Sequence, residues 1–223
     1  MNLEHNWNVS PAQAITIQEE LRQQTVLTDD FDQIQTVAGV DVGFDKTAKT
    51  GRAAIAVLHL PELELMETAV AEMVLHFPYV PGLLSFREIP VILKALEKLS
   101  EPPDLLLCDG QGYAHPRRLG IASHLGILTD IPAIGVAKTR LIGTHATVPK
   151  RKGSWTRLMD TNEVIGAVLR TRENVKPLYI SAGHRVSLAT SLSYVMQCIT
   201  RYKLPETTRQ AHALSLFSKK RHG

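Results

Sequence analysis

The sequence has few cysteines and no long hydrophobic run. Two of its 223 residues are cysteine, which cannot build a disulfide framework, and no Cys-x-x-Cys or Cys/His pair at zinc-finger spacing supports a structural zinc. No apolar stretch reaches the roughly 20 residues that cross a bilayer. The polar segment 1–11 also lacks the apolar core of a secretory signal. We therefore expect a cytoplasmic protein with no membrane partner.

The chain also lacks internal repeats, low-complexity segments and linkers, so residues 1–223 are expected to form a single domain. A hydrophobic content of 44% is ample for one core. The net charge of +3 permits a polyanionic partner without requiring one. Positive side chains cluster at 117–118, 150–152 and 219–222, and each cluster is equally typical of a solvated surface.

The apolar periodicity predicts an α/β fold. A helix is expected over 10–26, with Ser10 as its cap and Pro11 in its first turn. Three antiparallel strands should follow, at 35–44, 52–60 and 63–75. The order strand, helix, strand then predicts a parallel βαβ crossover. The elements expected after the three strands are helices at 85–99, 117–129, 187–202 and 207–217 and strands at 104–109, 131–137, 163–171 and 178–181. The result is a mixed central sheet flanked by helices.

A proline-rich loop precedes the helix at 85–99. In Pro78-Tyr79-Val80-Pro81-Gly82 the prolines restrict φ around Tyr79, and Gly82 permits a sharp turn. Such a loop would hold an aromatic ring at its tip. Ser85 is predicted as the helix N-cap with Glu88 at the capping-box position. Taken alone, the loop is more typical of a connector whose tyrosine and leucines pack on the core.

Two carboxylates interrupt apolar strands. Asp41 lies between two valines, where burial is costly unless a positive group pairs with it. Asp109 ends a strand and precedes Gly110, at the strand end where α/β sheets bind ligands. With Glu88 these acids would form an all-oxygen site that suits Mg²⁺ or Mn²⁺ better than zinc. The alternatives are an aspartate bonded to a nearby amide and an ordinary Asp-Gly turn, because spacing alone does not bring the acids together.

Four basic side chains follow predicted strands or lie on the last helix. Lys138 follows the strand at 131–137, where a cation could meet a phosphate. His115 follows the Asp109 loop, His184 follows another strand, and His212 lies on the last helix. A single histidine of this kind is more often structural than catalytic. What favours function is that Asp109, His115 and Lys138 all fall at or just beyond strand ends.

Together these segments resemble the endonuclease V family. The resemblance covers roughly residues 37–212, and its motifs are Val40-Asp41-Val42-Gly43-Phe44, Pro78-Tyr79-Val80-Pro81-Gly82, Leu84-Ser85-Phe86-Arg87-Glu88, Asp109-Gly110-Gln111-Gly112, the run from His115 to His124, Gly135-Val136-Ala137-Lys138 and Gly183-His184-Arg185-Val186-Ser187. It implies an RNase H-like fold. It also implies a metal-dependent DNA repair endonuclease that extrudes deoxyinosine, the deaminated form of deoxyadenosine. Such an enzyme nicks the strand on the 3′ side of the lesion and leaves a 3′-hydroxyl and a 5′-phosphate.

The resemblance also implies roles for particular residues. Asp41, Glu88 and Asp109 correspond to a metal site for Mg²⁺, with Mn²⁺ as a substitute, and Tyr79 to a wedge that fills the gap left by the displaced base. Further catalytic roles fall to His115, Lys138 and His212. The walls and backbone contacts of the base pocket are expected at Gly82, Leu84, Gly110, Gly120, Ile121 and Leu141.

Extruding the base is physically reasonable, because a mispaired inosine costs less to unstack than a well-paired base. The expected partner is DNA containing deoxyinosine, and the expected state is a monomer. The sequence leaves three alternatives open: a ribonuclease directed to inosine in RNA, a binding module of the same fold with weak catalysis, and a small-molecule phosphohydrolase using the same carboxylates.

Overall fold

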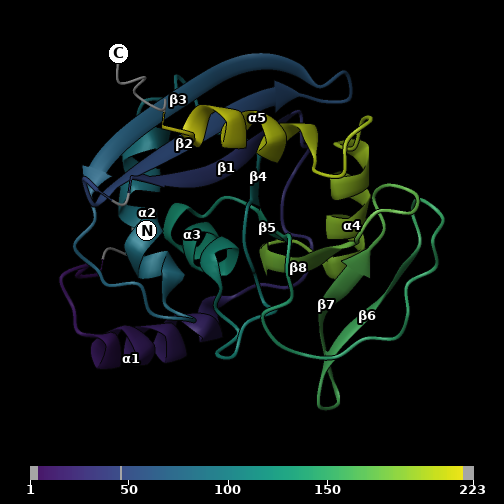
Figure 1. Cartoon of the computed structure of the whole chain (residues 1–223), viewed down its shortest axis with the longest axis horizontal. Coiled ribbons are helices and arrows are strands. Elements are labelled where there is room, and N and C mark those ends of the chain that lie inside the picture. Colours follow the sequence, from purple (N-terminus) through teal and green to yellow (C-terminus); the bar gives the residue numbers. More distant parts are fainter. Residues whose placement is uncertain (1–4, 46, 218–223) are drawn as a thin grey trace.

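An eight-stranded mixed sheet runs through the protein in the order β3-β2-β1-β4-β5-β8-β7-β6, as the ribbon of Figure 1 shows. The computed structural model describes residues 5–45 and 47–217, so the basic segment 219–222 lies outside the described residues. The strands are β1 (Thr36–Asp45), β2 (Thr50–His59), β3 (Glu64–Val74), β4 (Leu105–Cys108), β5 (Ala133–Ala137), β6 (Trp155–Asp160), β7 (Glu163–Leu169) and β8 (Leu178–His184).

The first half of the sheet follows the prediction from sequence. β1, β2 and β3 pair antiparallel, and β1, β4 and β5 pair parallel. The helix α3 (Ile121–Thr129) joins β4 to β5 as the predicted crossover. The mixed α/β fold with its flanked sheet is therefore confirmed.

The second half of the sheet is antiparallel, since β8 pairs with β5, β7 with β8, and β6 with β7. The sequence did not predict β6. Its pattern is weak because Leu158 is the one buried residue in a strand that otherwise carries polar or half-exposed side chains. β6 is held by backbone pairing to β7 more than by burial of its own side chains.

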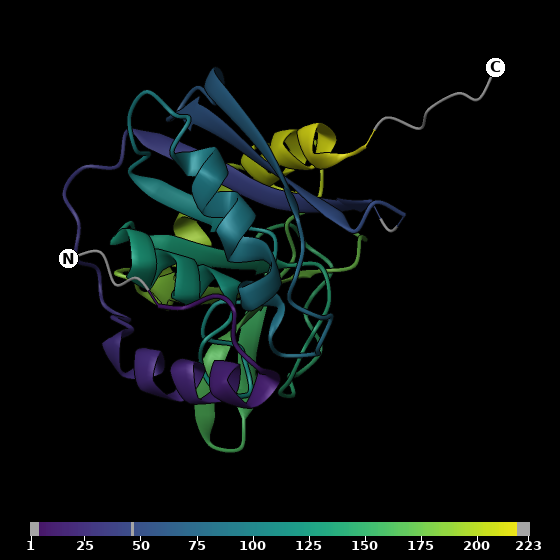
Figure 2. The same ribbon diagram turned by 90° about the vertical axis from the view of Figure 1, so that its left-hand side faces the viewer.

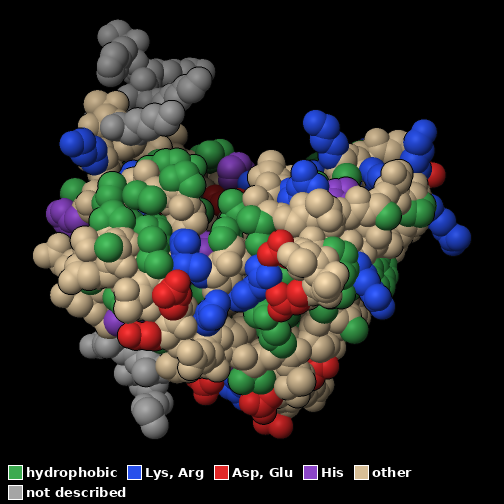
Figure 3. Space-filling model, turned by 90° about the horizontal axis from the view of Figure 1, so that it is seen from below, with side chains coloured by type: hydrophobic (Ala, Val, Ile, Leu, Met, Phe, Trp, Pro, Cys, Tyr) green, Lys and Arg blue, Asp and Glu red, His purple; other side chains and the backbone are tan. Residues whose placement is uncertain are grey.

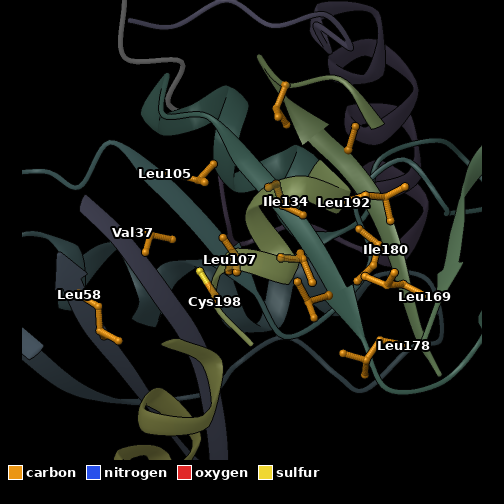
Figure 4. Packing of buried hydrophobic residues seen from close by; sticks show 14 of the residues in the cluster. Val37, Leu58, Leu105, Leu107, Ile134, Leu169, Leu178, Ile180, Leu192 and Cys198 are labelled. Carbon is orange, nitrogen blue, oxygen red and sulfur yellow. The ribbon is translucent and has the colours of Figure 1, made fainter. Parts of the chain in front are cut away.

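Helices cover both faces of the sheet (Figure 2). α2 (Leu84–Leu96) and α3 pack on one face, and α4 (Leu188–Gln197) and α5 (Glu206–Ser215) pack on the other. Figure 4 shows the core under α4 and α5, where strand residues such as Leu107 and Ile134 meet Cys198. α1 (Pro11–Leu21) lies outside these layers and packs against α3. Among the described residues, no helix is long and apolar enough to cross a membrane.

Several helix boundaries differ from the prediction, among them the end of α4, which lies at Gln197 rather than at 202. α1 ends at Leu21 and continues as a short 3-10 turn, Arg22–Gln24. The N-cap of α2 is Leu83, so the prediction of Ser85 as cap is wrong, and Pro90 lies inside the helix. Ser85 instead bonds Nδ1 of His124 at 3.0 Å. α3 begins at Ile121 rather than at 117, because Arg118 takes a left-handed conformation with φ of 57° and bonds acids on β6 and β7.

Candidate active site

Three neighbouring parallel strands bring a charged side chain to the same end and the same face of the sheet. Val37, Leu105 and Ile134 all belong to the core under α4 and α5. Because strand side chains alternate, Asp41, Asp109 and Lys138 share that face. Val40 pairs with Cys108, and the amide of Asp109 donates to the carbonyl of Val40, so the two aspartates lie side by side. Lys138 Nζ contacts Oδ2 of Asp109.

Two glycines allow α5 to approach Asp41. A Cβ at Gly39 would lie 2.1 Å from the backbone of Thr207, and one at Gly43 would lie 2.2 Å from the carbonyl oxygen of Ser215. Both glycines share the face of Asp41, two residues to either side. α5 can therefore place His212 Nδ1 at 3.1 Å from Oδ2 of Asp41 and the Ser215 hydroxyl in hydrogen-bond contact with the same oxygen.

The acids form a cluster that lacks enough positive charge. One ligand atom each of Asp41, Asp109 and His212 lies within 4.8 Å of the others. Glu88 lines the same pocket from α2 and is buried. Burial, and next the charges of Asp41 and Asp109, raise the pKa of Glu88 well above its usual value. Burial raises the pKa of Asp109 to about 6, although Lys138 opposes this.

This donor set fits a hard divalent cation. Asp41, Glu88 and Asp109 line one pocket, in which Lys138 pairs with Asp109, and burial with the neighbouring acids raises the pKa of Glu88 and Asp109. Oxygen-rich sites of this kind suit Mg²⁺ or Mn²⁺, while His212 offers one nitrogen at the edge. Asp41, Glu88 and Asp109 thus share this pocket, while the closest group of ligand atoms is that of Asp41, Asp109 and His212.

A pocket of about 540 Å³ opens beside the acids. Its lining combines glycine-containing segments and apolar side chains. They come from the ends of β1, β4 and β5, from the 78–84 loop and from the start of α3. The predicted pocket residues found in its lining are Gly82, Leu84, Gly110, Ile121 and Leu141. Gly120 lies behind this lining, where a Cβ would fall 2.3 Å from the carbonyl of Gln111.

The 78–84 loop presents Tyr79 at the mouth of the pocket. Tyr79 is 74% exposed, so it is not a connector side chain packed on the core. Gly82 has φ of 78°, which favours glycine. Its carbonyl oxygen accepts hydrogen bonds from Gln18, His115 and Arg117. The loop is therefore fixed at Gly82 while its aromatic tip stays in solvent.

His115 faces this loop rather than the carboxylates. Its Nε2 bonds the Gly82 carbonyl at 3.0 Å, and its Nδ1 accepts from the amide of Arg117 at 3.2 Å. Burial, and next the charge of Arg117, lower the pKa of His115 to about 4. The ring is therefore neutral at pH 7, with its hydrogen on Nε2.

His184 lies at a different place. Its Nδ1 accepts from the amide of Val26, and its Nε2 is 3.6 Å from Asp130, away from the acids. Two residues at the site carried no sequence signal that we used, Gln18 and Ser215. Ser215 lies one helical turn after His212, and a search for polar residues at that spacing could have found it.

The surface matches a polyanionic partner. Figure 3 shows a small acidic area recessed in a hollow, and on the same face several lysine and arginine side chains interspersed with exposed acidic ones. Lys138, Arg140 and Leu141 line one side of the pocket. Positive charge around a recessed acidic centre is the arrangement expected where a phosphate backbone passes a metal site.

Comparisons with known proteins agree with this geometry. A family model described as Endonuclease V matches residues 19–213. The endonuclease V of Rippkaea orientalis is 60% identical over 203 residues, which cover 91% of this chain and 89% of that protein. The solved endonuclease V of Streptomyces avermitilis is 41% identical with a TM-score of 0.89, covering 94% of this chain and 93% of that one.

A second solved relative is bound to nucleic acid. A variant of the Ciona intestinalis endonuclease V, in complex with a 23mer DNA containing an inosine followed by a ribo-adenosine, is 30% identical with a TM-score of 0.82. The match covers 93% of this chain and 97% of that one. The sheet with helices on both faces is the RNase H-like fold of the solved endonuclease V structures, which are nucleases. This chain belongs to the endonuclease V family, and it is a DNA repair endonuclease that binds nucleic acid.

Proposed function

We propose that the enzyme is metal-dependent, recognises deoxyinosine by extruding the base, and nicks the strand on the 3′ side of the lesion. The products would be a 3′-hydroxyl and a 5′-phosphate. The observation that carries the proposal is the pocket of about 540 Å³ that directly adjoins the Asp41–Asp109 cluster. A pocket of this size accepts a purine base, and an acidic centre beside it faces the phosphate that follows that base.

Asp41, Glu88 and Asp109 would hold Mg²⁺, with Mn²⁺ as a substitute. A bound divalent cation supplies an activated water and stabilises the leaving oxygen. The protein keeps Asp41 oriented through Ser215 and His212, which both contact its Oδ2. In the absence of substrate, Lys138 compensates Asp109. In the complex its ammonium group is placed to contact the scissile phosphate.

Base selection would use the pocket walls. Glycine-rich segments at Gly82 and Gly110 let main-chain groups approach the edge of hypoxanthine closely. The exocyclic amino groups of adenine and guanine would clash with such walls or remain unpaired there. Tyr79 would fill the space that the base leaves in the stack. The Ciona intestinalis relative in complex with inosine-containing DNA supports this choice of lesion.

The proposal is tested by nicking assays with the variant Asp109→Asn. Asparagine keeps the shape of the side chain but loses the charge that a cation needs. We expect cleavage of a deoxyinosine oligonucleotide in Mg²⁺ to fall at least about a hundredfold, because electrostatic groups at such centres contribute on that scale. Binding of the same DNA should persist. Asp45→Asn, at the half-buried end of β1, is the matched control, because asparagine keeps the oxygen that accepts from the amides of Thr47 and Ala48.

Chelation of the metal should reproduce the loss of cleavage in the unmodified enzyme. Near-normal nicking by Asp109→Asn would contradict the metal-site assignment. Parallel assays on inosine-containing RNA show which nucleic acid the enzyme prefers. Preferential cleavage of RNA would favour the ribonuclease alternative over the DNA repair endonuclease. End-labelling of the products identifies which side of the lesion is cut.

A further inference from the structure

A buried glutamine on α1 bonds two separate segments of the pocket. Gln18 is 1% exposed. Its Nε2 donates to the carbonyl oxygens of Gly82 at 3.1 Å and of Leu119 at 3.2 Å, and its Oε1 accepts from Nε of Arg117. An amide group has two N–H hydrogens and an acceptor oxygen, and each of them has a protein partner here. Such full satisfaction of a buried amide fixes its orientation and that of its partners.

The two carbonyls come from different parts of the pocket wall. Gly82 belongs to the 78–84 loop, which carries Tyr79 and Leu84. Leu119 directly precedes the start of α3, where Ile121 lines the pocket. The side chain of Gln18 therefore bridges these two wall segments, which His115 and Arg117 also join directly at the Gly82 carbonyl.

Gly82 is the more constrained end of this link. Its carbonyl oxygen also accepts from Nε2 of His115 and from a guanidinium nitrogen of Arg117 at 2.7 Å. Three donors thus converge on an oxygen with two lone pairs. Gln18 differs from the other two donors because it also bonds Leu119.

We propose that Gln18 is a positioning residue that fixes the separation of the two wall segments and so determines which bases the pocket admits. The inference rests on the proposed function, since it takes the pocket to hold an extruded purine. Guanine differs from hypoxanthine by one exocyclic amino group, and a wall that can yield accommodates that group. Loss of the link therefore affects selection between bases more than the chemical step.

The test compares single-turnover nicking of matched oligonucleotides that contain inosine or guanine at one position. Gln18→Leu keeps the volume of the side chain and removes all three hydrogen bonds. Gln18→Glu keeps the acceptor for Arg117 and replaces the two donated hydrogen bonds with charge repulsion from the carbonyls. For both variants we expect the ratio of inosine to guanine cleavage to fall about tenfold, equivalent to the loss of one to two hydrogen bonds. The ratio should change by a larger factor than the rate at saturating enzyme on inosine does.

The matched control is Gln13→Ala on the same helix. Gln13 closes the capping box of α1 with Ser10 and does not line the pocket, so its removal weakens α1 without loosening the wall. Unchanged discrimination in Gln18→Glu, or an equal loss in Gln13→Ala, would overturn the inference.

Hydrogen exchange provides a second measurement that needs no substrate. In Gln18→Leu the amides of segments 78–84 and 119–122 should exchange faster than in Gln13→Ala. Equal exchange in the two variants would contradict the positioning role even if the wild-type enzyme proved not to cleave inosine. Failure of the wild type to nick inosine, with faster exchange in Gln18→Leu, would instead contradict the proposed function and leave the link between the walls intact.

Discussion

Tyr79 is a large aromatic residue that keeps 74% of its surface in solvent. Its neighbours in the loop are fixed, because Leu83 is buried and the Gly82 carbonyl has three donors. An exposed ring on a rigid support is ready to stack with a base without losing much further freedom. This arrangement is what binding to a disrupted base stack requires.

Tyr79→Ala is therefore expected to weaken binding of inosine-containing DNA about ten- to hundredfold, since stacking of one base on an aromatic ring contributes about 1–3 kcal/mol. The acids are untouched, so cleavage should persist at high enzyme concentration. Tyr79→Phe keeps the ring and should bind like the wild type. Equal affinities for all three proteins, measured by fluorescence anisotropy, would show that the ring does not contact the DNA.

Among single residues, the sequence predicted those whose charge departs from the apolar pattern of a strand. Asp41 and Asp109 were identified because each interrupts an apolar strand, and Lys138 because it follows one. Gln18 could not be found in this way, since its partners are the carbonyls of Gly82 and Leu119 and any helix surface can carry a glutamine. A role of this kind depends on which distant segments the fold brings next to the side chain, and the local sequence pattern does not specify those segments.

Among the elements, α5 depends on the two glycines of β1. At Gly43 an added Cβ would meet the carbonyl oxygen of Ser215 at 2.2 Å, so the helix would have to move. That movement would separate Ser215 and His212 from Asp41. The same contacts therefore dock α5 on β1 and orient Asp41 in the candidate metal site.

We expect Gly43→Ala to lower the free energy of unfolding by about 1–3 kcal/mol, as overpacking against backbone does. Nicking should fall about tenfold or more, because a displacement of about 1 Å at a catalytic centre has effects of that size. Gly51→Ala on β2 is the matched change, since its Cβ would meet only the flexible end of the Leu75 side chain. Urea unfolding measures the stability of both variants, and nicking assays are run where both are folded. If Gly43→Ala is then as active as Gly51→Ala, α5 does not orient Asp41.

The elements themselves were largely predictable, and their ends less so. Strands and helices with several buried residues, such as β1 and α2, matched their periodicity. β6 was missed because it buries one residue, and α3 starts late because side chains hold Arg118 in a left-handed conformation. Hydrogen bonds between distant segments determine that β6 forms and that α3 starts at Ile121. The periodicity of apolar residues carries no information on such bonds.

Across the whole molecule, buried neutral histidines couple folding to pH. His124 is fully buried between Ser85 and His5, and burial, followed by the charge of His5, lowers its pKa well below the usual 6.5. The folded state then stays neutral where the unfolded chain takes up a proton. Its stabilising contribution is complete above pH 6.5 and is lost as the pH falls below that value.

We expect the free energy of unfolding to fall with decreasing pH by up to about 1.4 kcal/mol per pH unit for this one histidine. His124→Phe should remove that part of the slope between pH 6.5 and 5. Leu125→Ala, a buried neighbour on α3 without a titrating group, should lower stability at every pH and keep the slope. Urea unfolding at several pH values measures both. An unchanged slope in His124→Phe would contradict the assignment.

The contact between Asp41 and His212 joins residues 171 positions apart in the chain. During synthesis the β1–β3 antiparallel strands can pair long before α5 has been made. In a chain whose synthesis has not reached α5, Asp41 therefore lacks the helix that orients its carboxylate. The contacts of His212 and Ser215 with Asp41 form only once α5 has docked on β1.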